Sequence, residues 1–279
     1  MVIPPLHYFP VATAILFPVT FLATYSLSVF LGHTEMDWPY ISDTSAYPPE
    51  SCIFSQFVNL GAFLVAITVY IRYKQVQEFY LSHQMGVASH RTNQVGLILG
   101  WIGALGISIV ANFQETSVFV VHFIGAMMAF GVGTLYLWTQ VYASFILCSL
   151  SHGRILLYGR ALLAIICSIG FPLMLSCGVI AAQEFRKKDK TKWQPEDGGW
   201  AWHVASTSTE WIIATCFFLV LLSFVPEFKK IWLDSPQICV RLTHRDARLF
   251  DDPEQTIFRS TYADSVTSTE DIPAAVVRA

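Results

Sequence analysis

Two long apolar segments, residues 94–111 and 117–138, lie near the middle of the sequence and are separated by only five residues. Neither contains an Asp, Glu, Lys or Arg residue over its 18 or 22 positions. At 1.5 Å per residue, a helix of this length crosses a hydrocarbon core about 30 Å thick. We therefore predict a tight transmembrane hairpin.

Four more apolar segments flank this hairpin, two on each side. They cover about residues 10–31, 52–71, 161–182 and 203–225, and each has the length of a membrane span. Residues 229–279 are polar, and a segment of that composition buries too little apolar surface to offset its ordering entropy. The sequence predicts an all-α fold, with a six-transmembrane-helix bundle over residues 1–228 and a mostly disordered tail over 229–279.

Small residues recur at helical spacing within the hairpin. They are Gly96, Gly100, Gly103 and Gly106 in the first segment and Gly125, Ala129 and Gly133 in the second. Lipid tails are as apolar as Leu, so membrane helices associate where small residues let their backbones approach closely. We expect the third and fourth helices to pack against each other through these residues.

Composition limits the classes of partner. Hydrophobic residues make up 54% of the chain and charged residues 13%, compared with about a quarter in globular proteins, so membrane lipids are its expected surroundings. The net charge is −3, and the basic residues lie between the spans rather than in one patch. This pattern excludes nucleic acid as a partner.

Basic residues in the short loops predict the orientation. On the side of both termini lie Arg72, Lys74, Arg91, Arg154 and Arg160, whereas the first two loops on the other side have no Lys or Arg. The loop after the fifth span is an exception, with five basic residues between 186 and 192. The first helix and the other loops lead us to predict that both termini, and hence the tail, are cytosolic.

Polar side chains inside the spans are the first candidates for a functional site, because burying them in lipid is costly. His122 and Glu210 lie roughly 8 to 10 Å from the non-cytosolic ends of their helices, and Gln56 and Asn59 reach about that level. We expect these four residues to form a polar cluster in which His122 pairs with Glu210. Three roles stay open: a packing network, a pH-sensing or ligand-binding site, and catalysis.

The sequence carries no enzyme signature. An intramembrane metallohydrolase needs about three zinc ligands around one water, but His33, His122 and His203 come from three different elements. The sequence contains no HExxH pair, GxSxG elbow, P-loop or CxxC pair. We expect no catalytic activity, no cofactor and no metal site, and an intramembrane hydrolase is the weakest alternative.

The first loop combines aromatic, proline and acidic residues, with Trp38, Pro39 and Tyr40 followed by Asp43. Trp and Tyr favour the membrane–water interface, so the simpler interpretation is a set of interfacial anchors, as also for Trp193 and the tryptophans at 200 and 202. The alternative is a functional motif on the lumenal side that includes Asp43.

Several short motifs, in order, resemble those of a known family. They are Trp-Pro-Tyr-Ile-Ser-Asp-Thr at 38–44, Pro-Pro-Glu-Ser at 48–51, Arg-Tyr-Lys-Gln-Val at 72–76, Ser-Ile-Val-Ala-Asn-Phe-Gln-Glu at 108–115, Trp-Gln-Pro-Glu at 193–196 and Glu-Trp at 210–211. Over nearly all of residues 10–230 the chain resembles the DNA-damage-regulated autophagy modulators, the DRAM family, and most of all its second, lysosomal member. It is more distantly similar to the six-span Frag/Sfk family, which is tied to lipid handling.

The resemblance implies a multi-pass protein of the lysosomal membrane or a related endomembrane that promotes autophagy, without an established catalytic activity. Its implied partners are membrane lipids and autophagy or lysosomal proteins. The alternative is a regulator of membrane lipid distribution, acting by lipid translocation or as a lipid-kinase scaffold, at the plasma membrane or endomembranes. The family offers no active site to transfer, and residues 241–279 match none of its motifs.

Overall fold

The computed structural model describes residues 5–147, 154–187, 189 and 191–232. Its helices are α1 (Tyr8–Phe30), α2 (Glu50–Ser82), α3 (Val87–Asn112), α4 (Phe119–Ala126), the π-helical η2 (Met127–Val132), α5 (Gly133–Ile146), α6 (Arg154–Glu184), α7 (Trp200–Leu222) and α8 (Val225–Phe228), with 3-10 turns η1 (Asp43–Ser45) and η4 (Pro195–Asp197). The described residues form no β-strand. Six helical segments are long and apolar enough to span a membrane, so the predicted all-α, six-span fold is confirmed.

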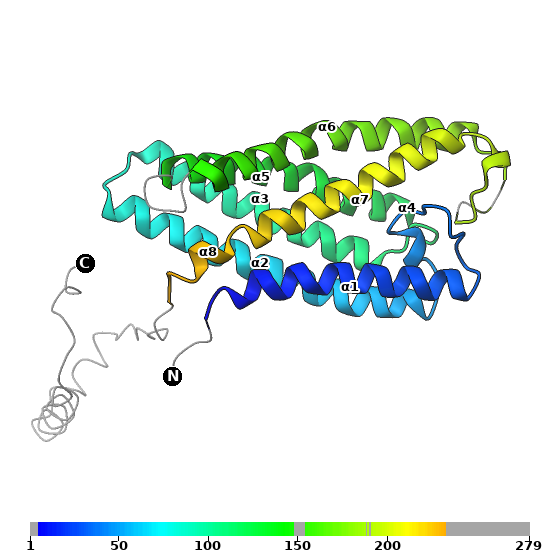
Figure 1. The fold of residues 1–279 in the computed structure, drawn as a ribbon, viewed down its shortest axis with the longest axis horizontal. Helices are drawn as coiled ribbons and strands as arrows, with labels where there is room; N and C mark the ends of the chain where they lie inside the picture. Colours follow the sequence, from blue (N-terminus) through cyan, green and yellow to red (C-terminus); the bar gives the residue numbers. More distant parts are fainter. Residues whose placement is uncertain (1–4, 148–153, 188, 190, 233–279) are drawn as a thin grey trace, which may run out of the picture. The chain divides into compact units, whose positions relative to one another are not determined.

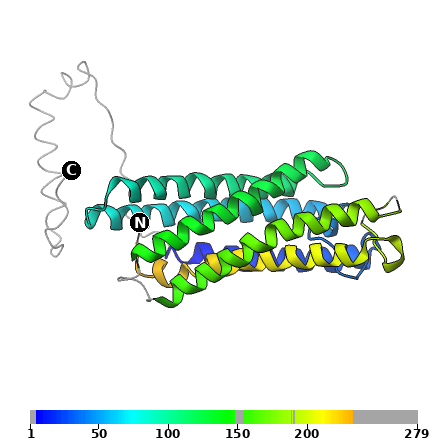
Figure 2. The same ribbon diagram turned by 90° about the horizontal axis from the view of Figure 1, so that it is seen from above.

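The spans form a closed ring in chain order (Figures 1 and 2). Each packs against the next, with α4, η2 and α5 together making the fourth span, and α7 returns to pack against α1. Helix α8 also contacts α1, so the start of the first span and the end of the last lie at one end of the bundle, here called the terminal end. The loops 31–49, 113–118 and 185–199 lie at the other, the far end. The predicted tail falls mostly on residues 233–279, outside the described residues.

Several helices extend well beyond the predicted spans, α2 and α3 among them. Helix α2 continues to Ser82 and α3 begins at Val87, so most of the polar loop expected between residues 72 and 93 is helical. The buried side chains of Val76 and Tyr80 explain this, since they form a second small apolar core with Ala143 and its neighbours on α5. Hydropathy therefore predicts only the part of each helix that lies in the hydrocarbon core. Tertiary packing keeps the chain helical beyond that core.

Closely packed small residues join α3 to the fourth span. A Cβ atom added to Gly106 would lie 2.6 Å from the backbone nitrogen of Ala129 and 2.6 Å from the carbonyl oxygen of Gly125. One added to Gly125 would lie 2.7 Å from Ile109 Cγ2 on α3. The π-helical segment η2 starts beside this contact, and π-helical turns are rare interruptions of α-helices.

The remaining glycines expected at this contact have varied neighbours. A Cβ atom on Gly96 would meet Thr139 of α5, and one on Gly133 would meet Phe217 of α7. Gly100 faces both Val69 of α2 and the fourth span. The small residues therefore serve several helix contacts around the ring rather than the hairpin alone.

Candidate functional site

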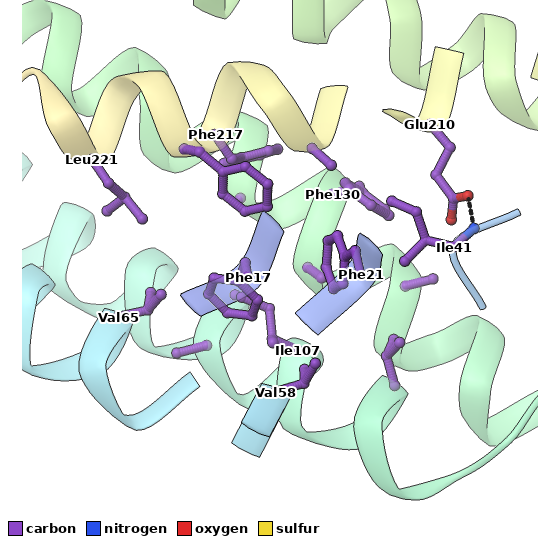
Figure 3. Close-up of a pocket in the computed structure, with 18 of the residues that line it drawn as sticks. Phe17, Phe21, Ile41, Val58, Val65, Ile107, Phe130, Glu210, Phe217 and Leu221 are labelled. Atoms are coloured by element: carbon purple, nitrogen blue, oxygen red, sulfur yellow. Dashed lines mark hydrogen bonds between the residues drawn. The ribbon is translucent and has the colours of Figure 1, made fainter. Parts of the chain in front are cut away.

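A narrow apolar cavity runs inside the ring (Figure 3). It has a volume of about 140 Å³ and is lined by residues from α1, α2, α3, the fourth span and α7, together with the first loop. Six phenylalanine rings form much of its wall: Phe17, Phe21, Phe54, Phe130, Phe217 and Phe218. Ligand sites combine such apolar walls with a few placed polar groups, and here those groups gather at the far end.

The polar far end of the cavity is built by Glu210, His122 and Ser42. Glu210 Oε2 accepts a 2.8 Å hydrogen bond from the backbone N–H of Ile41 (Figure 3). His122 Nδ1 lies 2.7 Å from the carbonyl oxygen of Phe113, and because a carbonyl can only accept, Nδ1 carries the proton. The other ring nitrogen of His122, Nε2, faces Glu115 Oε2 at 4.0 Å.

The first loop closes this end by binding α7. Trp38 Nε1 donates to Ser208 Oγ at 2.5 Å, and Trp211 Nε1 donates to the carbonyl oxygen of Pro39 at 3.1 Å. The ring of Tyr40 lies edge-on to that of His203, with centroids 5.2 Å apart. The loop motif expected at the membrane interface is thus also the lid of the cavity, although Trp38 itself stays exposed.

Asp43 is the most deeply buried carboxyl of this loop, with 2% of its surface exposed. Its Oδ2 accepts a 3.2 Å hydrogen bond from the backbone N–H of Tyr40. Burial raises the pKa of Asp43 well above its usual range, and the nearby charges of Glu115 and Glu210 raise it further. Burial also raises the pKa of the Tyr40 hydroxyl. The surroundings of Asp43 therefore favour its protonated form.

Acidification is expected to stabilise the protein through Asp43. Because its folded-state pKa is raised, the folded protein keeps this proton to a higher pH than the unfolded chain does. The free energy of unfolding should therefore fall as pH rises above about 4, the usual pKa of an Asp in an unfolded chain. Thermal denaturation at a series of pH values measures this, and Asp43→Asn should flatten the profile.

The exposed Asp37 of the same loop supplies the control for that experiment, since Asp37→Asn should keep the wild-type profile. An Asp43→Asn variant with an unchanged slope would show that Asp43 contributes no pH dependence.

The structure does not bring the four polar span residues together as expected. Gln56 is exposed, and Asn59 bonds instead to Asn112 at 2.9 Å and to Ser108 at 2.6 Å on α3. His122 and Glu210 line the same cavity, but the structure pairs Glu210 with the first loop and His122 with the loop that contains Glu115. The expected pairing of His122 with Glu210 is therefore corrected to two separate contacts at one end of the cavity.

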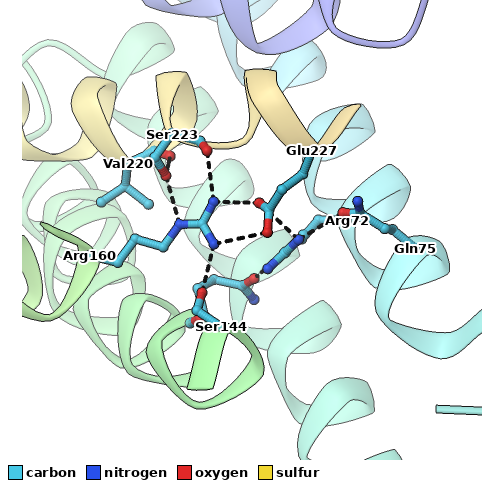
Figure 4. A network of polar contacts seen from close by, with 8 residues as sticks. Arg72, Gln75, Ser144, Arg160, Val220, Ser223 and Glu227 are labelled. Carbon is cyan, nitrogen blue, oxygen red and sulfur yellow. Dashed lines mark hydrogen bonds and ion pairs between the residues drawn. The ribbon is translucent and has the colours of Figure 1, made fainter. Parts of the chain in front are cut away.

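The terminal end holds a buried charge network that the sequence did not predict (Figure 4). Glu227 Oε2 lies 2.5 Å from Arg160 Nη2 and 3.1 Å from Arg72 Nη1. The three residues are only 5%, 2% and 1% exposed, respectively. The sequence places Arg72 and Arg160 in loops and Glu227 just beyond the last predicted span, 203–225, so their joint burial was not predicted.

Neighbouring side chains complete this network and tie four helical segments together. Arg160 Nε donates to Ser223 Oγ at 2.8 Å, and Arg72 Nε donates to Gln140 Oε1 at 3.1 Å. Both guanidinium groups lie over the ring of Phe224, at 4.8 and 5.1 Å from its centroid. The network links α2, α5, α6 and the α7–α8 junction.

The three histidines considered as zinc ligands lie in separate environments. His33 Nδ1 is 2.5 Å from Glu50 Oε1, while His203 stacks on Trp193 with centroids 4.1 Å apart. Trp193 is thus buried rather than an interfacial anchor. Within the part of the chain that the structure describes, no group of three or more His, Cys, Asp or Glu residues is placed to hold a metal ion.

Comparisons with known proteins cover almost all of the described chain. Residues 5–231 match the family model described as the Frag1/DRAM/Sfk1/Cwh43P N-terminal domain. The chain is 38% identical to human DNA damage-regulated autophagy modulator protein 2 over 231 residues, which are 82% of this chain and 86% of that protein. No solved structure matches it.

Two further relatives carry related names. Human DNA damage-regulated autophagy modulator protein 1 is 35% identical over 214 residues, 76% of this chain and 87% of its own length. The modulator of macroautophagy TMEM150B of Danio rerio is 31% identical over 224 residues, 80% of this chain and 85% of its own length.

Proposed function

Because this chain belongs to the Frag1/DRAM/Sfk1/Cwh43P family, within which it resembles the DRAM proteins, we propose that it promotes autophagy from the lysosomal membrane or a related endomembrane. The observation that carries this proposal is the 38% identity to a named autophagy modulator over 82% of the chain. The other two relatives support it, since their names also describe autophagy modulators. The multi-pass membrane fold is compatible with that location.

The proposed mode of action is binding of lipid or protein partners rather than catalysis. The cavity supports this part, because its walls are apolar and suit hydrocarbon. The buried charged groups also have structural partners: Glu210 holds the first loop and Glu227 holds two arginines. The same cavity favours a second candidate, a regulator of membrane lipid distribution.

Deletion and rescue in cells separate the two candidates. Autophagic flux is measured as turnover of the lipidated autophagosome marker with and without a blocker of lysosomal acidification, and phospholipid asymmetry is measured with surface-binding probes. Loss of the protein should lower autophagic flux, and re-expression of the full chain should restore it. The re-expressed protein should localise to membranes that carry a lysosomal marker. Normal flux combined with altered lipid asymmetry would replace the first candidate by the second.

Both termini are expected to be cytosolic, because the first loop lacks basic residues and the following turn region carries three. A tag after Ala279 should be digested by protease added to sealed endomembrane vesicles. A tag inserted after Thr116, an exposed position in the far-end loop, is the matched control and should be protected. The reverse pattern would invert the orientation and place the far end of the bundle in the cytosol.

A further inference from the structure

The cavity is long and narrow. On α7 its lining extends from Glu210 to Leu221, which is roughly 16 Å at 1.5 Å per residue. Its volume is about 140 Å³. Spread over such a length, this space fits one extended hydrocarbon chain, but not two chains or a fused ring system.

The far end of the cavity presents acceptors rather than donors. Glu210 is 8% exposed, and among the described residues no hydrogen bond reaches its Oε1. Asp43 and Glu115 lie nearby, and the Nδ1–H of His122 donates to the carbonyl oxygen of Phe113, which leaves Nε2 of His122 as an acceptor. No Lys or Arg in the described part of the chain forms an ion pair with Glu210.

A buried carboxylate is stable only when cationic or hydrogen-bonding partners compensate it. The first loop supplies one N–H, from Ile41, to Glu210 Oε2. A ligand that enters the cavity with a positively charged head would supply the missing partner for Oε1. An anionic head would instead be repelled by the carboxyl groups at this end.

We propose that the cavity is a binding site for a single-chain lipophilic amine, with its ammonium group on Glu210 and its hydrocarbon chain between the rings of Phe17, Phe21 and Phe217. The amine comes either from the bilayer, as a sphingoid long-chain base, or from solution, as a cationic amphiphile. This inference rests on the proposed function, in which the protein acts by binding lipid or protein partners, because it names one such lipid-like partner. It adds the chemical class of that partner and the residue that selects it.

Photo-crosslinking to the purified full-length chain in phosphatidylcholine nanodiscs tests the head-group preference. The probe is a photoreactive, clickable sphingosine, and the competitors are dodecylamine, dodecanol and dodecanoate, which share one chain and differ only in charge. Dodecylamine should compete at a concentration at least about tenfold lower than dodecanol, because charge-assisted hydrogen bonds are the stronger kind. Dodecanoate should compete least.

Two variants assign the effect to the cavity. Glu210→Gln should remove the difference between the concentrations at which dodecylamine and dodecanol compete. If this variant fails to fold, the comparison of the two competitors on the wild type still tests the head-group preference. Gly103→Ala should weaken probe labelling without loss of thermal stability, because the added Cβ would lie in the cavity wall with its nearest neighbour at 3.7 Å. Gly159→Ala, where nothing lies within 4 Å, is the matched control and should label like the wild type.

The source of the amine follows from a second competition with unlabelled sphingosine. Competition by sphingosine at a lower concentration than dodecylamine assigns a long-chain base of the bilayer, and the reverse order assigns a soluble amine. Equal competition by dodecanol, or labelling of peptides outside the cavity wall, would overturn the proposal. These measurements use no autophagy readout, so their failure is distinguishable from failure of the proposed function.

Discussion

Replacing Glu227 by Gln is expected to destabilise the protein by about 3 to 5 kcal/mol, because removing one partner of a buried ion network leaves uncompensated charge. Here the charge left behind is that of Arg72 and Arg160, which are 1% and 2% exposed. Their attraction to Glu227 is strong only because water is excluded, and the same exclusion makes its loss costly. Thermal or denaturant unfolding of the purified full chain in detergent measures the effect.

Two comparisons make this result specific. Glu78→Gln removes an exposed carboxyl group of α2 at the terminal end of the bundle. This change should alter the free energy of unfolding by no more than about 0.5 kcal/mol. Replacing all three network residues together, as Arg72→Met, Arg160→Met and Glu227→Leu, should recover most of the loss, since packed apolar residues can replace buried ion networks. If Glu227→Gln is as stable as Glu78→Gln, water reaches the two arginines and the network contributes little to the stability of the fold.

Substituting Gly106 by Ala is expected to cost about 3 kcal/mol, at the upper end of the usual range for overpacking. The added Cβ would lie 2.6 Å from two backbone atoms, of Ala129 and Gly125, and backbone cannot rotate away as a side chain can. In membrane helices such backbone contact is itself a source of association. The expected observation is an early unfolding transition and loss of monodisperse protein in detergent.

Gly103→Ala is the matched control for this substitution, because it lies one turn away on α3 and its Cβ would have no neighbour closer than 3.7 Å. Ala favours helix over Gly by up to about 1 kcal/mol, so this control should be as stable as the wild type or slightly more stable. Equal stability of both variants would show that α3 and the fourth span separate readily.

The number and order of the spans could be predicted from the sequence, because a hydrocarbon core demands about 20 apolar residues per helix. The ends of the helices could not. Beyond Ile71 the hydropathy of α2 falls, yet the helix continues because Val76 and Tyr80 are buried against α5. Arg72 consequently appeared to begin a loop, and its burial against Glu227 was invisible in the pattern.

The depth of the polar residues was easier to predict than their neighbours. Counting residues along a helix gives distance along the membrane normal, but it says little about direction around the helix axis. Gln56 and Asn59 are three residues apart, which turns their side chains about 60° from each other. That angle suffices to place Asn59 against α3 while Gln56 faces outward. Glu115 was overlooked because it lies in the short connection between two spans.

The contacts of the first loop have a consequence for biosynthesis. Trp38, Pro39 and Ile41 take their hydrogen-bond partners from α7, about 170 residues later in the chain. At translation rates of 5 to 20 residues per second, those partners follow on the order of ten to thirty seconds after the loop. Spans one to five can pack in order as they emerge, each against its predecessor. A chain that ends before the last span lacks the α7 partners of this loop. The far end of the bundle is therefore complete only in chains that include the last span.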